Sequence, residues 1–190
     1  MKRLALLLVC LASFTNTPAS ADSGCPAGTV QTIVSPDGMT LSLLFDQFAV
    51  SAPAGAARTF AKKTCEVLVP LHLAAGNSLG IYRVDYRGFA HLSDLQGSEL
   101  ITRYAFVADK WQRVARKLVN GAYDGDFDFS ETVGAGTMRR AGCGEAAVLR
   151  IVIALSLTAR GPMAALSTLD SVDGAPKRGL VYHFNVQKCQ

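Results

Sequence analysis

The sequence predicts an all-β fold, an antiparallel, jelly-roll-like β-sandwich with at most one short helix, stapled by two disulfides. Glycine is frequent and charged residues make up only 18% of the chain. Short runs rich in Val, Leu, Ile, Thr and aromatic residues alternate with Gly, Pro and Asp turns, which is typical of antiparallel β domains. Four of the five cysteines lie outside an N-terminal export segment, and an even number of thiols in an exported chain indicates a disulfide framework.

Residues 1–21 are expected to form a signal peptide. A basic head, Met1-Lys2-Arg3, precedes an apolar run from Leu4 to Phe14, and Ala19-Ser20-Ala21 supplies the small residues of a cleavage site. The apolar run contains Cys10 and is too short to cross a bilayer, which takes about 20 residues; an uncleaved N-terminal anchor is the alternative. We therefore expect residues 22–190 to be a single domain without a transmembrane segment. The expected location is outside the cell, or the periplasm if the source is a Gram-negative bacterium.

Five strands are expected in the first half of the domain, at Thr29–Val34, Met39–Phe45, Cys65–Leu73, Leu79–Leu92 and Glu99–Ala108. Ser35-Pro36-Asp37-Gly38 is a turn, since proline presets φ and glycine accepts a positive φ. Pro70 lacks a backbone donor, so the Cys65–Leu73 strand is expected at a sheet edge or a bulge. Gly88 indicates a bulge within Leu79–Leu92.

Lys110–Asn120 is the segment in which a short helix is expected. Trp111, Val114, Ala115, Leu118 and Val119 form one stripe at helical spacing, and the basic residues lie off it. A helix of this length needs tertiary packing, so we expect it to lie across a sheet.

Four further strands are expected after Gly121. Tyr123–Val133 alternates, with Asp124, Asp126 and Asp128 on one face and aromatic residues on the other, as in a half-buried strand. Ala146–Ala159 is the most apolar segment and is expected at the centre of a sheet. Ala164–Leu169 and Leu180–Val186 follow, separated by a polar loop at Asp170–Arg178.

Four thiols allow three pairings. Cys143 precedes the Ala146–Ala159 strand and Cys189 follows the last strand, so the two cysteines meet if those strands are antiparallel neighbours. Cys25 precedes the first strand and Cys65 begins the third, and two chain reversals bring both starts to one end. We therefore favour Cys25–Cys65 and Cys143–Cys189.

A possible nucleophile is Ser78, in Gly76-Asn77-Ser78-Leu79-Gly80, which matches G-x-S-x-G. A nucleophile elbow needs a strand, a sharp turn and a helix, whereas Ile81 to Tyr86 alternates as a strand does. Nothing in the sequence places His72, His91 or His183 beside Ser78. A hairpin turn is the better interpretation.

The carboxylates Asp124, Asp126 and Asp128, with Glu131 close behind, are hard oxygen ligands that suit calcium. The spacing lacks the EF-hand pattern, so a solvated strand face is the commoner explanation. The same carboxylates are a second hypothesis for catalysis, although a glycosidase pair needs carboxyl groups on both sides of a cleft. Calcium is the one cofactor that we consider; otherwise none is expected.

Tyr82, Tyr86 and Phe89 are candidates for a sugar-stacking platform, because Tyr82 and Tyr86 share a strand face; cross-strand packing is the alternative. The basic residues between Lys110 and Lys117 are candidates for contact with an anionic envelope surface or polysaccharide. Removal of Lys2 and Arg3 reduces the net charge from +4 to +2, which does not favour nucleic acid.

Several short motifs occur in an order that resembles a known family. They are Gly24-Cys25-Pro26-Ala27-Gly28-Thr29-Val30, Phe45-Asp46-Gln47-Phe48, Lys63-Thr64-Cys65, Tyr86-Arg87-Gly88-Phe89-Ala90, Gly142-Cys143-Gly144, Asp170-Ser171 and Lys188-Cys189. The order resembles the secreted proteins grouped as domain of unknown function 4360, over nearly all of residues 24–190. The resemblance implies a secreted β domain and no particular reaction.

Two classes of function follow. The first is a secreted or cell-surface domain, non-enzymatic, that binds a cell-envelope polymer, a polysaccharide or another partner. The alternative is a small secreted hydrolase that uses Ser78 or the carboxylates of Asp124, Asp126, Asp128 and Glu131. Sandwich folds serve many functions, so the fold does not choose between them.

Overall fold

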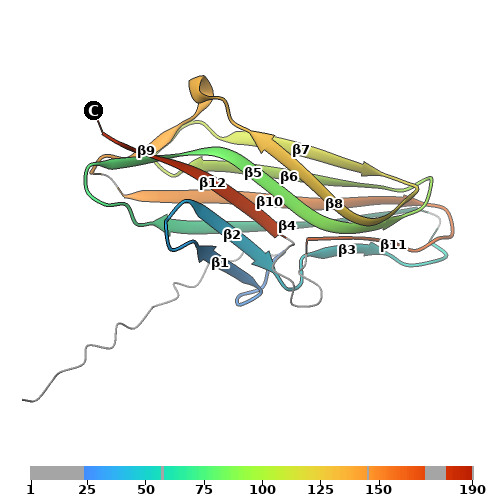
Figure 1. The fold of residues 1–190 in the computed structure, drawn as a ribbon. Helices are drawn as coiled ribbons and strands as arrows, with labels where there is room; N and C mark the ends of the chain where they lie inside the picture. Colours follow the sequence, from blue (N-terminus) through green and yellow to red (C-terminus); the bar gives the residue numbers. More distant parts are fainter. Residues whose placement is uncertain (1–23, 57, 145, 170–178, 190) are drawn as a thin grey trace, which may run out of the picture.

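The protein is a two-layered antiparallel β-sandwich, seen here in a computed structural model that describes residues 24–56, 58–144, 146–169 and 179–189 (Figure 1). The expected signal peptide and the Asp170–Arg178 loop lie outside the described residues. The elements are β1 (Val30–Val34), β2 (Thr40–Phe45), β3 (Ala49–Ala52), β4 (Arg58–Leu71), β5 (Asn77–Leu92), β6 (Gly97–Phe106), β7 (Arg113–Asn120), β8 (Tyr123–Thr132), a 3-10 turn η1 (Ala135–Thr137), β9 (Arg140–Gly142), β10 (Ala147–Arg160), β11 (Ala165–Thr168) and β12 (Gly179–Lys188).

The strands form a large and a small sheet. The large sheet has the order β1-β2-β12-β5-β11-β3, and β8 and β9 also pair with β5. The small sheet has the order β4-β10-β6-β7. No helix in the described part of the chain is long and apolar enough to span a membrane. The predicted all-β sandwich is confirmed.

The core lies between the sheets and follows from period-two alternation. β6 alternates between half-buried and buried residues along its whole length, as a strand with one face on a core must. The fully buried side chains at the centre include Leu41, Leu43 and Phe45 from the large sheet and Leu149, Ile151, Ile153, Leu155 and Leu157 from the small sheet. β10, between β4 and β6, is the expected central strand.

β4 is an edge strand, as Pro70 predicted. The opposite edge of the small sheet is β7, where the structure contradicts the expected helix at Lys110–Asn120. Residues 113–120 pair with β6 in register, Ala115 opposite Thr102. Ala115 and Val119 point into the core, whereas Val114 and Leu118 are exposed. The backbone pairing of residues 113–120 with β6 stabilises a strand more than the helical stripe would stabilise a helix, because an isolated helix of this length has little stability.

The bulge in β5 lies at Tyr82 and not at Gly88. His183 of β12 pairs with Arg83 and Phe184 pairs with Ile81, which leaves Tyr82 as the extra residue. Gly88 instead stays in register opposite Phe127, and a Cβ at this position would lie 2.3 Å from the Phe127 ring. Glycine is needed there for space.

Both predicted disulfides are present, Cys25–Cys65 and Cys143–Cys189. The strand argument behind the second pairing is wrong, because β10 and β12 belong to different sheets. Cys143 instead follows β9, and β9 and β12 both pair with the start of β5, with Ser78 opposite Gly142 and Gln187 (Figure 1). Cys65 lies in the middle of β4 and not at its start.

Candidate functional site

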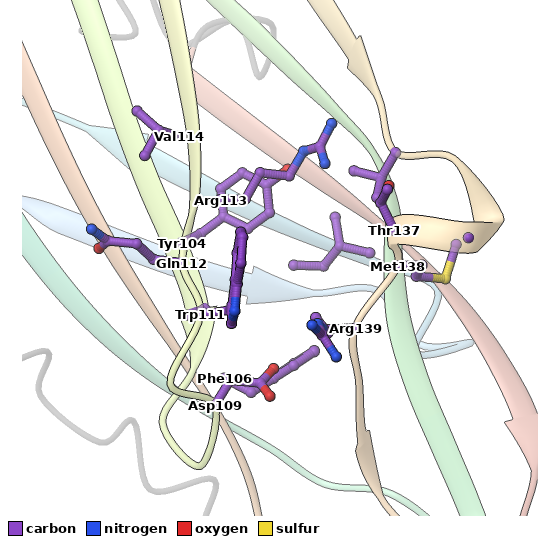
Figure 2. A pocket seen from close by; sticks show the side chains of 14 residues that line it. Tyr104, Phe106, Asp109, Trp111, Gln112, Arg113, Val114, Thr137, Met138 and Arg139 are labelled. Carbon is purple, nitrogen blue, oxygen red and sulfur yellow. The ribbon is translucent and has the colours of Figure 1, made fainter.

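A cleft of about 580 Å³ opens between the β6–β7 connection and the β8–β9 connection (Figure 2). Its apolar floor comes from core-facing residues of β5 and β6 and from the residue after β8, namely Ile81, Tyr104, Phe106 and Val133. Its polar lining comes from the two connections and the first residue of β7, namely Asp109, Gln112, Arg113, Thr137 and Arg139. An apolar cavity with a few polar groups around it is the usual form of a binding site for a small molecule or a polymer segment.

Trp111 is the most unusual residue of the cleft. It is the only tryptophan of the chain, and 72% of it is exposed. Figure 2 shows its indole ring edge-on, between the β6–β7 connection and the segment that carries Thr137, Met138 and Arg139. A large aromatic side chain left in water at the mouth of a cleft gains stability when a ligand covers it.

One wall of the cleft is held by a hydrogen-bond network that joins the two sheets. Arg113 Nε donates to Glu131 Oε1 at 2.6 Å, and the Tyr86 hydroxyl donates to Glu131 Oε2 at 3.0 Å. Thr102 Oγ1 in turn donates to the Tyr86 oxygen at 3.1 Å. Because these residues come from β5, β6, β7 and β8, the network fixes the β7 edge, and with it Arg113, against the large sheet.

The electrostatics of this wall favour the charged form of Arg113 and the protonated form of Tyr86. Burial lowers the pKa of Arg113, but the hydrogen bond and the charge of Glu131 outweigh burial and leave that pKa raised. Burial raises the pKa of the Tyr86 hydroxyl, so it remains a proton donor to Glu131. The floor residue Tyr104 also has a raised pKa through burial, and its ring meets Tyr182 edge-on at 5.4 Å. No titration near neutral pH is expected to alter the shape of the cleft through these groups.

The sequence did not identify this cleft. The helical spacing places Trp111 on the buried stripe of a helix, whereas in the structure the strand starts at Arg113 and Trp111 lies in the preceding connection. A lone tryptophan among Asp109, Lys110, Gln112 and Arg113 was the available signal, since polar neighbours on both sides are unusual for a core residue.

The expected sugar platform at Tyr82, Tyr86 and Phe89 is not formed. The bulge at Tyr82 reverses the alternation, so Tyr82 is exposed beside His183 while Tyr86 is fully buried between the sheets. Phe89 is half-buried, opposite Asp126 of β8 and Thr168 of β11. The prediction that Tyr82 and Tyr86 share a face is therefore wrong.

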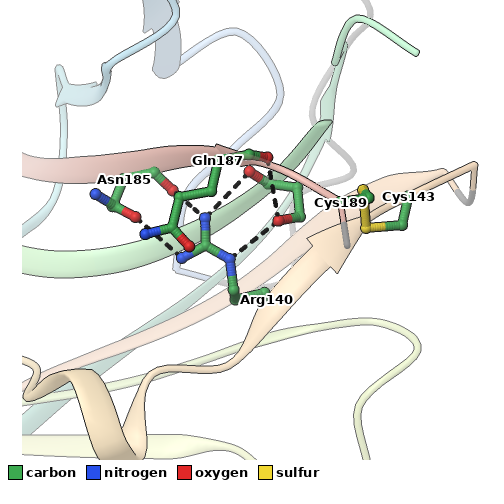
Figure 3. The surroundings of a disulfide bond; sticks show 6 residues. Arg140, Cys143, Asn185, Gln187 and Cys189 are labelled. Carbon is green, nitrogen blue, oxygen red and sulfur yellow. Dashed lines mark hydrogen bonds between the residues drawn. A yellow bond between two sulfur atoms is a disulfide. The ribbon is translucent and has the colours of Figure 1, made fainter. Parts of the chain in front are cut away.

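Ser78 lies in β5 opposite Gly142 of β9 and Gln187 of β12, and only 7% of it is exposed. The Cys143–Cys189 disulfide joins the ends of β9 and β12 in the same region, where Arg140 also lies (Figure 3). The Ser78 Oγ accepts a hydrogen bond from Arg140 Nε at 3.0 Å. Arg140 also donates to the backbone oxygens of Ser78 and Asn185 and to the Asn185 side chain. This arginine ties β9 to β5 and β12, and Ser78 has a place in that structural network; a strand, and no helix, follows it.

The four carboxylates that were candidates for calcium or catalysis are divided between the faces of β8. Asp124, Asp126 and Asp128 are exposed on the outer face, where Asp124 lies 3.1 Å from His91 and Asp128 lies 3.0 Å from Arg87. Glu131 lies on the inner face, in the network with Arg113. No group of three or more His, Cys, Asp or Glu in the described ranges is arranged to hold a metal ion, so geometry gives the calcium hypothesis no support.

A serine, a histidine and an aspartate lie together on the outer face of the large sheet, around Asp85. Its carboxylate accepts hydrogen bonds from Ser130 Oγ at 2.6 Å and Arg83 Nε at 2.7 Å, and His183 Nε2 lies 2.8 Å away. In a catalytic triad the histidine stands between the serine and the acid. Here the acid stands in the middle, so the cluster is a charge-paired anchor between β5, β8 and β12.

Comparison of the sequence with family models identifies the family. The family model described as Domain of unknown function (DUF4360) matches residues 19–189. The chain belongs to this family. This membership agrees with the resemblance seen in the motifs.

Two similar proteins give further context. An "Uncharacterized secreted protein" of Arthroderma benhamiae (strain ATCC MYA-4681 / CBS 112371) is 27% identical over 168 residues, which span 88% of this chain and 68% of the relative. A solved structure of TmCBM61 in complex with beta-1,4-galactotriose aligns with 90% of this chain and 86% of its own, at 12% identity and a TM-score of 0.29, too low to support an argument. The description of the fungal relative as secreted and the two disulfides agree with an extracellular location.

Proposed function

We propose that this protein is an exported, non-enzymatic domain that binds a polysaccharide in the cleft beside Trp111. The observation that carries the proposal is a tryptophan, 72% exposed, at the mouth of a cleft with an apolar floor and a polar rim. Export rests on the predicted signal peptide at residues 1–21, with the mature domain starting at Asp22.

The chemistry of the cleft suits a sugar ring. The C–H face of a pyranose is apolar and packs on a flat indole, while its hydroxyls lie around the edge of the ring. Asp109 and Thr137 oxygens accept hydrogen bonds from such hydroxyls, and Gln112 and Arg139 donate to them. The cleft volume of about 580 Å³ lies within the range of small-molecule sites, so a short stretch of a polymer fits.

A binding role also fits the way in which the titratable groups are used. Glu131 is engaged by Arg113 and Tyr86, and Asp85 by Arg83, Ser130 and His183. Ser78 is engaged by Arg140. These groups have structural partners across strands and do not converge on the cleft as a catalytic pair would.

The proposal can be tested by fluorescence, because Trp111 is the only tryptophan. The mature protein is titrated with a panel of soluble polysaccharides and their oligomers. A binding sugar is expected to shift the emission to shorter wavelength as it covers the indole. Binding to insoluble polymers is measured in parallel by co-sedimentation, which does not depend on the fluorophore.

Two matched variants decide the result. Trp111→Ala is expected to abolish co-sedimentation, whereas Tyr82→Ala, which removes an exposed aromatic ring from the outer face of the other sheet, should bind as the unmodified protein does. Absence of any emission change, with equal retention of both variants, would refute the proposal.

A further inference from the structure

A second hollow, of about 260 Å³, also has Trp111 in its lining. It is lined by outward-facing residues of the small sheet, including Arg103 of β6 and Arg150 and Val152 of β10. Both hollows share the β6–β7 connection, with Asp109, Trp111 and Gln112. Trp111 therefore lines both depressions, and we treat the two as one groove that runs from the sandwich edge to the outward-facing residues of the small sheet.

Positive charge dominates this groove. Five basic side chains line its two halves, Arg103, Lys110, Arg113, Arg139 and Arg150, against one carboxylate, Asp109. Arg113 is paired with Glu131 and Arg150 with Glu66, both at 2.6 Å. Among the described residues, Arg103, Lys110 and Arg139 have no ion pair. Three cations less the one carboxylate leave a local excess of +2.

That local excess equals the excess of the whole mature domain. The chain carries 19 basic and 15 acidic residues, a net charge of +4, and removal of Lys2 and Arg3 with the predicted signal peptide leaves +2. The remainder of the domain is therefore balanced. A single-signed charge gathered in one groove attracts ligands of the opposite sign.

We infer that the ligand of this groove is an acidic polysaccharide, one whose carboxylate or sulfate groups follow one another along the chain. The inference rests on the proposed function and adds the charge of the polymer. A sugar ring covers Trp111, an anionic group on the cleft side meets Arg139, and a group on the sheet side meets Arg103 and Lys110. Guanidinium groups bind carboxylate and sulfate oxygens through parallel hydrogen bonds, which a neutral sugar cannot offer.

The same features favour a glycan over a nucleic acid. Single-stranded nucleic acids bind where successive bases find aromatic rings and each phosphate meets a basic groove. Here Trp111 is the one exposed aromatic ring of the groove, and three cations without an ion pair line it, which matches a polymer with sparse charges and one stacked unit. Single-stranded DNA is therefore tested as a competitor of the polysaccharides.

The experiment compares two pairs of polymers in which both members share a sugar backbone and one member carries negative charge. Oligogalacturonate is compared with its methyl-esterified form, and dextran sulfate with dextran, by Trp111 fluorescence and by calorimetry at 20 mM and 500 mM NaCl. We expect one acidic member to bind about tenfold more tightly than its neutral partner at low salt, because three exposed ion pairs act together. The advantage should fall to about twofold at high salt through screening.

Charge variants locate the effect. Arg103→Gln is expected to weaken binding of the acidic polymer about threefold and to leave binding of the neutral one unchanged. Arg139→Gln, which also removes a donor to the sugar hydroxyls, should weaken binding of the acidic polymer more than binding of the neutral one. Arg160→Gln is the matched control. It removes the same charge from β10, but at a position ten residues beyond the groove residue Arg150, and a strand rises roughly 3.3 Å per residue. It should have no effect.

The outcomes separate the two proposals. Equal affinity for acidic and neutral polymers, with binding still lost in Trp111→Ala, would overturn this inference and keep the proposed function. Tighter binding of single-stranded DNA than of any glycan would overturn both. Loss of affinity in Arg160→Gln equal to that in Arg139→Gln would show a general charge effect and refute the groove as the binding site of the acidic polymer.

Discussion

The two disulfides should contribute unequally to stability, although each closes a chain segment of similar length. Cys25 and Cys65 are 40 residues apart and Cys143 and Cys189 are 46 apart. The chain-entropy model gives about 3.9 and about 4.0 kcal/mol for these closures, so this effect alone predicts equal losses.

Burial makes the difference. Cys25 and Cys65 are 2% and 0% exposed in the core, whereas Cys143 is exposed and Cys189 half-buried at the end of the sheet. Replacing the core pair by alanine removes two methylene-sized atoms from a packed interior, at about 0.8 kcal/mol each, and the cavity raises this to about 2 kcal/mol in total. We expect Cys25→Ala/Cys65→Ala to lose about 6 kcal/mol and Cys143→Ala/Cys189→Ala about 4 kcal/mol.

Urea unfolding of the mature protein at pH 7 measures both losses, with mass spectrometry confirming that the remaining disulfide is intact. The free energy must be obtained with each variant's own m-value, since loss of a cross-link exposes more surface on unfolding. Failure of only the core variant to fold is the extreme form of the expected result. Equal losses, or a larger loss at Cys143–Cys189, would refute the argument from burial.

Three further predictions concern the networks and the core. Burial raises the pKa of Asp85, but hydrogen bonds from Ser130, Arg83 and His183 outweigh it and leave that pKa below its usual value. Its stabilising effect is therefore present above about pH 4 and is lost as the pH falls through the folded-state pKa. Asp85→Asn should lower the free energy of unfolding by about 2 kcal/mol at pH 7 and by much less at pH 3; an equal deficit at both pH values would contradict this assignment. Glu131→Gln should lower the Tm by about 6 °C in calorimetry, because Arg113 and Tyr86 lose a charged acceptor, and an unchanged Tm would show that the network is dispensable. Gly88→Ala should cost more than 2 kcal/mol in urea unfolding, because its Cβ would lie 2.3 Å from the Phe127 ring, while Gly136→Ala, with open space around it, should cost little; equal effects would contradict the role of Gly88 as a space for that ring.

The elements that could be predicted from the sequence are those whose own residues indicate how the strand is buried and where it lies in its sheet. The alternation of β6, the apolar run of β10 and the proline in β4 each describe one strand and its neighbours, and all three predictions agree with the structure. The cysteine pairs were also correct, although the second was correct for the wrong reason, since β5 and not β10 brings Cys143 to Cys189.

The parts that could not be predicted depend on partners distant in sequence. The strand at 113–120 exists because β6 offers a free edge for pairing, and nothing within the segment states this. The bulge at Tyr82 is defined only by its register with β12. The cleft combines residues 104–114 with residues 133–139, and neither stretch alone has the composition of a site.

The two open edges of the small sheet also affect how the protein behaves at high concentration. β4 has Pro70, which lacks an amide hydrogen, and β7 carries Arg113, Arg116 and Lys117. A strand from a second molecule that tried to extend either edge would meet a missing donor or a row of like charges. Arg113, which borders the groove, is thus also one of the charged side chains that hinder edge-to-edge aggregation, so substitutions at this residue should be checked for fibril formation as well as for binding.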